Sequence, residues 1–376
     1  MKLEIKKIEL FREDLPLKTP FRHSSSGLIE YLKDVFIKVT DIEGNSGVAE
    51  IRGNNHYVTG ETPESIIAII KDIFAPKLLG KDSLNIENLN SIIEKSAAEN
   101  SSAKALVNVA LYDLKAKILK SSVAELLGGI KNNKMPSDAS IPFMSLTDTR
   151  DLLNKYLDDG FRLIKVRVGL PSFEEDIARV SEVRKVLNKR NIEALIAIDG
   201  NQCWEIEEAI TKVKELSKYK LAFVEQPIPV SSPLEMKYLK ENIPVPLMAD
   251  ESVKGPKEAK ELIKNQAVNY LHIKLSKAGG FTNSQDIINL ADSSSIGYMI
   301  GSMDIGPLGC AATIHRAASS SAKFFELDGF KRVDLSRIKS VKRPPVIKNG
   351  LAYLPSGYGL GIELNEKSID QVADIS

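Results

Sequence analysis

Three acidic residues, Asp199, Glu225 and Asp250, each end a short apolar run in the middle of the sequence. Glu225 follows Asp199 by 26 residues, and Asp250 follows Glu225 by 25. Each interval is about one strand-helix unit, so a parallel barrel would bring the three carboxylates to one rim. Clustered acids repel one another unless a cation neutralises them. Mg²⁺ prefers oxygen ligands and keeps positions open for a substrate oxygen, so the pattern predicts a magnesium site.

Basic residues flank these acids along the chain. Lys274 follows Asp250 by 24 residues, and Lys165 and Arg167 lie about one unit before the first acid. Residues two apart on a strand share a face, so Lys165 and Arg167 both point inward. A lysine beside a metal or another cation has a lowered pKa, which suits it to proton abstraction near neutral pH. We therefore expect a metal that holds a substrate carboxylate and stabilises the enediolate formed when the adjacent C–H loses its proton.

The elements that must position these residues begin after Pro136, where apolar runs alternate with amphipathic stretches. Eight strands interleaved with helices favour a parallel α/β barrel over an open sheet. The expected strands are residues 141–145, 163–168, 194–199, 221–225, 245–250, 268–275, 296–301 and 323–327. The expected helices include residues 173–189, 205–218, 257–264 and 283–291.

The first 130 residues have a different pattern. Residues 3–10 and 35–39 alternate with period two, as half-buried strands do. From Thr62, a plausible helix cap followed by Pro63, the pattern is helical to about Gly129. We expect an α+β domain over residues 1–130, a barrel over 131–330, and a turn-rich segment over 331–376 that packs back on the first domain.

Bulk composition excludes several classes of protein. The 51 Lys and Arg balance 50 Asp and Glu, so nothing favours nucleic acid or an anionic membrane as a partner. Cys203 and Cys310 form no CxxC motif, which argues against a disulfide framework or a zinc site. There is no signal-peptide pattern and no run of about 18 apolar residues. We expect a cytoplasmic enzyme.

Several motifs resemble those of the muconate-lactonising subgroup of the enolase superfamily, and the similarity covers nearly the whole chain. They are Asp-Gly-Asn-Gln at 199–202, Val-Glu-Gln-Pro at 224–227, Met-Ala-Asp-Glu-Ser at 248–252, Ile-Lys-Leu-Ser-Lys-Ala-Gly-Gly at 273–280 and Gly-Leu-Gly-Ile-Glu-Leu at 359–364. The resemblance implies an α+β capping domain over a modified (β/α)₇β TIM-like barrel, and commonly a homo-oligomer.

The resemblance also implies roles for individual residues. Asp199, Glu225 and Asp250 would bind Mg²⁺, and Lys274 would act as acid/base or stabilise the enolate. Asn201 and Glu251 adjoin these ligands and are better candidates for supporting them than for binding the metal.

One motif departs from the family. Its Lys-x-Lys reads Lys165-Val166-Arg167 here, so the usual second base is an arginine. Arginine is almost always protonated, which makes it a poor base but a good clamp for a carboxylate or enolate. Either Arg167 is deprotonated in this site, or Lys274 works alone on one face, or Lys165 takes over. We favour Lys274.

The substrate is suggested by acids at the ends of later strands. Dipeptide epimerases of the subgroup carry Asp-x-Asp at the end of the eighth strand, to hold the substrate ammonium. This chain has Glu326-Leu327-Asp328, which points to a cationic amino group near Asp328. Asp304 is a further candidate contact, but no histidine adjoins it, which argues against the mandelate racemase branch. Arg22 and His23, in a Ser-rich segment read as an exposed loop, are candidates for contacts over the barrel mouth.

The resulting hypothesis is a Mg²⁺-dependent isomerase that acts on a small-molecule carboxylate and epimerises a dipeptide or another amino-acid derivative. A muconate-type cycloisomerase, an o-succinylbenzoate synthase or a sugar-acid dehydratase would use most of the same residues. A catalytically silent metal-binding homologue is the alternative of a different class. Both classes predict Mg²⁺ binding, but only an enzyme exchanges a substrate proton with solvent.

Overall fold

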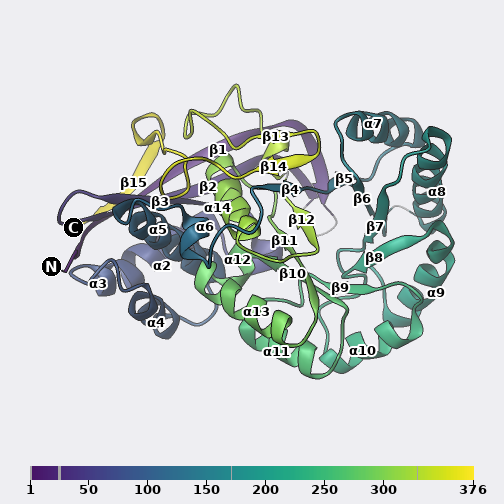
Figure 1. Ribbon diagram of the computed structural model, residues 1–376, viewed down its shortest axis with the longest axis horizontal. Coiled ribbons are helices and arrows are strands. Elements are labelled where there is room, and N and C mark those ends of the chain that lie inside the picture. Colours follow the sequence, from purple (N-terminus) through teal and green to yellow (C-terminus); the bar gives the residue numbers. More distant parts are fainter. Residues whose placement is uncertain (1, 24–26, 171, 328) are drawn as a thin grey trace.

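The fold is seen in a computed structural model, which describes residues 2–23, 27–170, 172–327 and 329–376. Three sheets organise the described residues: a four-stranded sheet, an eight-stranded sheet and a small three-stranded sheet. Figure 1 shows the four-stranded sheet with its helices on one side of the molecule and the barrel on the other. Among the described residues, no helix combines the length and apolar character needed to cross a membrane.

The four-stranded sheet has the order β15-β1-β2-β3. Its strands are β1 (Ile5–His23), β2 (Gly27–Asp41), β3 (Ser46–Arg52) and β15 (Asp370–Ile375). β15 lies at the far end of the sequence and pairs antiparallel with β1, so the last residues complete the first sheet. The expected loop around residues 21–27 was partly wrong: β1 continues through Arg22 and His23, whose backbones pair with Leu28 and Gly27.

Helices cover this sheet, as the sequence predicted for the region after Thr62. They are α1 (His56–Thr59), α2 (Pro63–Ile69), a π-helical turn (Ile70–Phe74), α3 (Ala75–Leu78), α4 (Ile86–Ser96), α5 (Ser101–Ile118) and α6 (Val123–Leu126). The predicted cap at Thr62 is confirmed, because its hydroxyl accepts the Ser65 N–H at 3.3 Å. Close packing of α5 on β3 needs Gly47, since a Cβ there would lie 2.1 Å from the carbonyl oxygen of Ala110.

The eight-stranded sheet is the predicted parallel barrel, with neighbours in sequence order. Its strands are β5 (Ala139–Ile141), β6 (Leu163–Arg167), β7 (Leu195–Asp199), β8 (Leu221–Glu225), β9 (Leu247–Ala249), β10 (Tyr270–Lys274), β11 (Gly297–Gly301) and β12 (Phe324–Glu326). The backbone N–H of Asp138 donates to the carbonyl of Phe325 at 2.8 Å, which links the first strand region to the last.

Helices follow the strands around the outside of the barrel (Figure 1). They are α7 (Leu146–Asp158), α8 (Phe173–Arg190), α9 (Ile206–Leu216), α10 (Pro233–Asn242), α11 (Pro256–Lys264), α12 (Leu275–Ala278), α13 (Phe281–Ser293) and α14 (Pro307–Ala318). The prediction of a first strand at 141–145 was wrong, because β5 ends at Ile141. Pro142 has no N–H for a ladder, and the Ser145 hydroxyl caps α7 by accepting the Asp148 N–H at 3.1 Å.

Apolar side chains fill the amino end of the barrel. The cluster consists of Leu163, Ala197, Phe223, Met248, Met299 and Phe324. The barrel is therefore a packed core rather than a channel, and a site must lie at the carboxyl ends of the strands.

The remaining sheet joins β4 (Lys134–Pro136) to β13 (Ile347–Lys348) and β14 (Leu351–Tyr353) in the order β13-β14-β4. It connects the start of the barrel region to the turn-rich C-terminal part. Domain boundaries at residues 130 and 330 stay a prediction.

Candidate active site

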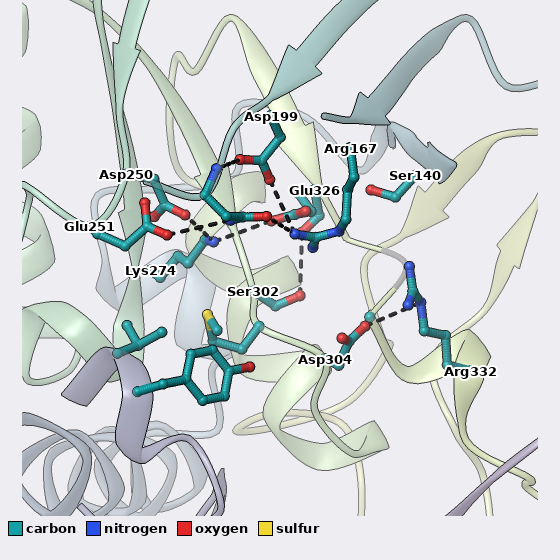
Figure 2. A pocket seen from close by; sticks show the side chains of 15 residues that line it. Ser140, Arg167, Asp199, Asp250, Glu251, Lys274, Ser302, Asp304, Glu326 and Arg332 are labelled. Carbon is teal, nitrogen blue, oxygen red and sulfur yellow. Dashed lines mark hydrogen bonds and ion pairs between the residues drawn. The ribbon is translucent and has the colours of Figure 1, made fainter. Parts of the chain in front are cut away.

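A pocket opens at the carboxyl ends of the barrel strands (Figure 2). Strand-end residues from six strands line it together with residues of the first domain. The lining includes Tyr57, Val58, Ser140, Arg167, Asp199, Asn201, Asp250, Glu251, Lys274, Ser302, Met303, Asp304, Glu326, Gly329 and Arg332. We call this space the inner pocket.

Glu225, at the end of β8, is completely buried, and both of its carboxylate oxygens have partners. Lys165 Nζ donates to Oε2 at 3.0 Å, and Nδ1 of His272 lies 2.7 Å from Oε1. Burial alone would raise the pKa of Glu225, but attraction by Lys165 and His272 outweighs it and lowers this pKa. Glu225 is therefore held ionised at the base of the site.

Asp250, which directly follows β9, lies between two lysines. Lys274 Nζ donates to Oδ2 at 2.8 Å, and Lys277 donates to Oδ1 and to the backbone carbonyl of Asp250. Burial opposes ionisation, yet the two ammonium groups hold the pKa of Asp250 well below its usual range. Lys274 lines the inner pocket, whereas Lys277 is buried and is not among the residues that line it.

Asp199, at the end of β7, is contacted by Arg167 from the neighbouring strand. Arg167 Nη1 lies 3.4 Å from Oδ2 of Asp199 and also donates to the side-chain oxygen of Asn201. Burial lowers the pKa of Arg167, but attraction by Asp199 and other acids outweighs it and raises this pKa. Arg167 is therefore a fixed cation clamped between Asp199 and Asn201.

Glu326, at the end of β12, contacts basic side chains from β6 and β10. Lys165 Nζ donates to Oε1 at 2.7 Å, and Lys274 Nζ and His272 Nε2 lie 3.6 Å and 3.4 Å from Oε2. His272 is completely buried. Lys165 and His272 thus both bridge Glu225 and Glu326, and Lys165 does not reach the wall of the inner pocket.

The cluster carries more negative than positive charge. Six acids (Asp138, Asp199, Glu225, Asp250, Glu251 and Glu326) face four cations (Lys165, Arg167, Lys274 and Lys277), which leaves a formal charge of −2 when all are ionised. Burial and then repulsion between acids raise the pKa of Asp199 to about 7 and that of Glu251 to about 8. The protein's own cations therefore do not fully compensate the acids.

The donor atoms and the charge of this cluster suit a divalent cation. Ligand atoms of Glu225, Asp250 and His272 lie within 4.8 Å of one another. The Oε2 atom of Glu251 is buried without a hydrogen-bond partner among the described residues. Carboxylate oxygens together with an excess of two negative charges fit a hard cation such as Mg²⁺. Asp199 lines the same pocket but lies outside the group of three.

Asp304 and Arg332 lie on the side of the inner pocket away from Asp250 and Glu251 (Figure 2). Asp304 Oδ1 lies 3.3 Å from Nε of Arg332, an ion pair whose side chains are 15% and 24% exposed. Tyr57, from α1 of the first domain, and Arg332, from the turn after β12, did not enter the sequence prediction. Neither belongs to a strand-end motif, and no spacing pattern in the sequence singles them out.

Three predicted substrate contacts stay predictions, because the structure does not describe their side chains. Asp328 lies outside the described residues, and the side chains of Arg22 and His23 are not described. The other predicted site residues gather around the pocket: Lys274, Arg167, Asp199, Asp250, Asn201, Glu251, Asp304 and Glu326 line it, and Lys165 and Glu225 lie directly beneath.

Comparisons with known proteins agree with this arrangement. Residues 6–128 match the family model of the mandelate racemase / muconate lactonizing enzyme N-terminal domain, and residues 148–368 match that of the enolase C-terminal domain-like family. The L-Ala-D/L-Glu epimerase of Bacillus subtilis (strain 168) is 30% identical over 368 residues, which cover 96% of this chain and 97% of that protein.

Solved structures of dipeptide epimerases and muconate lactonizing enzymes are also similar to this chain. A dipeptide epimerase from Cytophaga hutchinsonii, complexed with Mg and the dipeptide D-Ala-L-Val, is 26% identical with a TM-score of 0.90, covering 99% of this chain and 100% of that one. A muconate lactonizing enzyme from Pseudomonas fluorescens, complexed with muconolactone, is 27% identical with a TM-score of 0.91, covering 98% of each chain. Other matching proteins are named racemases and cycloisomerases. The chain therefore belongs to the mandelate racemase / muconate lactonizing enzyme family of the enolase superfamily, a family of enzymes.

Proposed function

We propose that this protein is a magnesium-dependent isomerase that removes the proton next to the carboxylate of a dipeptide or a related amino-acid derivative. The observation that carries the proposal is the position of Lys274, whose ammonium faces the inner pocket 2.8 Å from Asp250. A base that contacts one of the clustered acids is placed to remove the proton next to a substrate carboxylate that is bound at the same cluster.

Asp199, Glu225 and Asp250 are the residues that would hold the cation. Support comes from the uncompensated charge of the cluster and from the Mg found with the Cytophaga and Enterococcus faecalis dipeptide epimerases. Bound Mg²⁺ would polarise the substrate carboxylate and so acidify the adjacent C–H. Asn201 and Glu251, joined by a hydrogen bond of 3.3 Å, adjoin two of these acids and would orient them.

Lys274 is the best-placed base by position. Burial lowers its pKa, but attraction by Asp250 and other acids outweighs burial and raises this pKa, opposite to the lowered pKa that the sequence predicted. Of the described residues that line the inner pocket, Lys274 is the only lysine. Lys165 is buried and hydrogen-bonded to both Glu225 and Glu326. We infer that Lys165 fixes these two acids and that Lys274 takes the proton. Arg167 would then neutralise or clamp the substrate rather than exchange a proton.

This role for Arg167 gives weight to a second candidate function. Epimerisation delivers a proton to the face opposite the one that lost it, and a clamped guanidinium is a poor group for that exchange. A cycloisomerisation or a dehydration needs only one base, so either reaction fits Lys274 acting alone. A small-molecule carboxylate is the partner in every case, and a homo-oligomer stays a prediction.

Deuterium incorporation tests the proposal. Purified protein would be incubated with Mg²⁺ in D₂O and with pools of dipeptides, N-acyl amino acids or sugar acids. The masses of the products would then be measured by mass spectrometry. A gain of one dalton on an amino-acid derivative, lost in Asp250→Asn, is the expected result. Loss of water from a substrate would support the dehydration instead. No exchange in any pool by protein that binds Mg²⁺ would favour the catalytically silent alternative.

A further inference from the structure

A buried ion pair on α8 lies next to the strand ends that form the inner pocket. Arg179 donates to Asp176, three residues earlier on the same helix, and the two side chains are only 2% and 1% exposed. Burial raises the pKa of Asp176 to about 6 and lowers that of Arg179, although the two groups attract each other. A buried ion pair adds little net stability, because the lost hydration of both charges offsets their attraction. The hydrogen bonds of the pair to other segments are therefore the better guide to its role.

These hydrogen bonds go to the backbone that follows β6. Arg179 Nη1 donates to the carbonyl oxygen of Arg167 at 2.7 Å, and Nη2 donates to that of Leu170 at 3.4 Å. Asp176 Oδ2 accepts the N–H of Gly169 at 2.7 Å. The first part of α8 therefore holds the backbone of residues 167–170.

The same segment is also held by the residues at the end of β7. The N–H of Val168 donates to the carbonyl oxygen of Asp199 at 2.9 Å. Gly169 has a φ of +111°, and a Cβ there would lie 2.3 Å from Sγ of Cys203. The segment after β6 is thus packed between α8 and the end of β7, with little room to move.

The guanidinium of Arg179 also reaches the segment after β5. Nη1 lies 3.4 Å from the carbonyl oxygen of Pro142, and the central carbon lies 5.1 Å from the centre of the Phe143 ring. Pro142 and Phe143 directly follow β5, and Ser140 of β5 lines the inner pocket. One side chain therefore joins the ends of two neighbouring barrel strands.

The pocket residue at the centre of these contacts is Arg167 (Figure 2). Its Nη1 donates to Asn201 and lies 3.4 Å from Oδ2 of Asp199. Fixing a long side chain in one conformation costs entropy, so a fixed backbone favours this contact by reducing what remains to be ordered. Arg167 and a bound cation would compete for the same carboxylate. The position of Arg167 therefore decides how much of the negative charge of Asp199 a cation can use.

We propose that the Asp176–Arg179 pair positions Arg167 beside Asp199, and that Arg179 thereby limits how tightly the site binds its cation. The inference rests on the proposed function for the cation alone, since the hydrogen bonds of the pair need no metal. Arg179 is not among the described residues that line the inner pocket, so it is a positioning residue that acts through Arg167.

A double-mutant cycle on Mg²⁺ affinity tests the inference without turnover. Wild type, Arg179→Lys, Arg167→Met and the double variant are titrated with Mg²⁺ by calorimetry at about pH 8.5, above the pKa of about 7 of Asp199 and of about 8 of Glu251. Lysine keeps the charge at position 179 but lacks the planar fork that holds two carbonyl groups at once.

Arg167→Met should bind Mg²⁺ about tenfold more tightly than the wild type, because a competing cation is gone. Arg179→Lys should bind it about threefold more tightly or better, because Arg167 is no longer held beside Asp199. In the Arg167→Met background the same change should alter the affinity by less than about 1.5-fold. An Arg179→Lys affinity equal to that of the wild type, or an equal shift in both backgrounds, would overturn the inference.

Arg184→Lys is the matched control. Arg184 lies on the same helix and also donates to backbone carbonyls, those of Tyr219 and Lys220, so its replacement should keep the wild-type affinity. Asp176→Asn is a second variant that weakens the pair, and it should shift the affinity in the same direction as Arg179→Lys. Thermal unfolding shows whether the variants are folded, and failure of both pair variants to fold would assign the pair to folding and overturn the inference.

Hydrogen exchange separates this inference from the proposed function. A wild type that binds no Mg²⁺ would contradict the proposed function, and the amide of Gly169 would then decide the inference. That amide should exchange about tenfold faster or more in Arg179→Lys than in the wild type or in Arg184→Lys, because its acceptor Asp176 loses its fixed partner. Unchanged exchange would show that the segment is held without Arg179, and the inference would be wrong.

Discussion

Lys274 and Lys277 hold the two oxygens of one carboxylate: Lys274 Nζ lies 2.8 Å from Oδ2 of Asp250, and Lys277 donates to Oδ1. The first lysine faces the inner pocket and the second is buried behind it. Because the two lysines contact different oxygens of Asp250, their roles can be separated by mutation. Lys274 is assigned to the reaction, and Lys277 to the charge balance of Asp250.

Replacing Lys277 by methionine should make the protein more dependent on Mg²⁺ for stability. The change leaves Asp250 buried with one ammonium fewer, which destabilises the metal-free protein by roughly 3–5 kcal/mol. Mg²⁺ then supplies charge that the variant lacks, so the rise in Tm on adding Mg²⁺ should be larger than in the wild type. Differential scanning calorimetry with and without Mg²⁺ measures both effects.

Lys104→Met is the control for this experiment, because Lys104 is also buried and pairs with Glu94 at 2.8 Å outside the site. It should lose some stability but show the wild-type response to Mg²⁺. A smaller response in Lys277→Met than in the wild type would mean that Lys277 is needed to shape the site, contrary to the assignment.

Replacing Arg167 by lysine should change the stereochemistry of proton exchange. With Lys274 as the one base, the wild type should exchange the α-proton of one epimer much faster than that of the other. A lysine at position 167 has a pKa that surroundings can shift, so it can exchange protons on the second face. Separate incubation of the two epimers in D₂O should show the rate ratio moving toward one by about tenfold or more. Comparable rates for both epimers in the wild type would show that one base is not enough.

A pair of buried acids should make stability fall as the pH rises from about 4 to 6. Asp34 on β2 accepts the N–H of Gly306 at 3.0 Å, and Glu50 on β3 accepts that of Gly309 at 2.8 Å, both at the start of α14. Burial raises the pKa of Asp34 to about 6 and, with repulsion by Asp34, raises that of Glu50. Arg52 is the cation nearby that favours ionisation of Asp34.

The direction of this change in stability with pH follows from proton binding. The folded protein holds the Asp34 proton up to a higher pH than the unfolded chain does, so this contribution is complete below about pH 4 and is lost through pH 6. Asp34→Asn removes the titration, so its stability relative to the wild type should increase by roughly 1–3 kcal/mol between pH 4 and pH 7. Urea unfolding at several pH values measures this difference in the free energy of unfolding. Asp14→Asn is the control, because it changes an exposed carboxyl group on the neighbouring strand. A difference that stays constant with pH would refute the assignment.

The sequence predicts one part of this site well because strands and helices repeat at a regular interval. Asp199, Glu225 and Lys274 are the last residues of β7, β8 and β10, and Asp250 directly follows β9. In a parallel barrel this position alone brings side chains together, so spacing is enough to identify the group. Arg167 at the end of β6 was found in the same way.

Other parts of the site depend on contacts that spacing does not encode. Tyr57 reaches the pocket from the first domain, and the pairing of Asp304 with Arg332 joins the loop after β11 to the turn after β12. Such contacts depend on how separate segments pack in three dimensions. Similarly, β5 was misplaced because an apolar run and a helix cap overlap at residues 141–145, where Pro142 and Ser145 decide the outcome.

The most direct test of the central claim compares α-deuterium incorporation by the wild type and Lys274→Ala on the same substrate, with Mg²⁺ binding measured in both. The account predicts that the variant still binds Mg²⁺ and that its exchange rate falls by about 10²–10⁴-fold, the usual contribution of a positioned general base. Exchange in Lys274→Ala at the wild-type rate would contradict it, because another group would then have to take the proton.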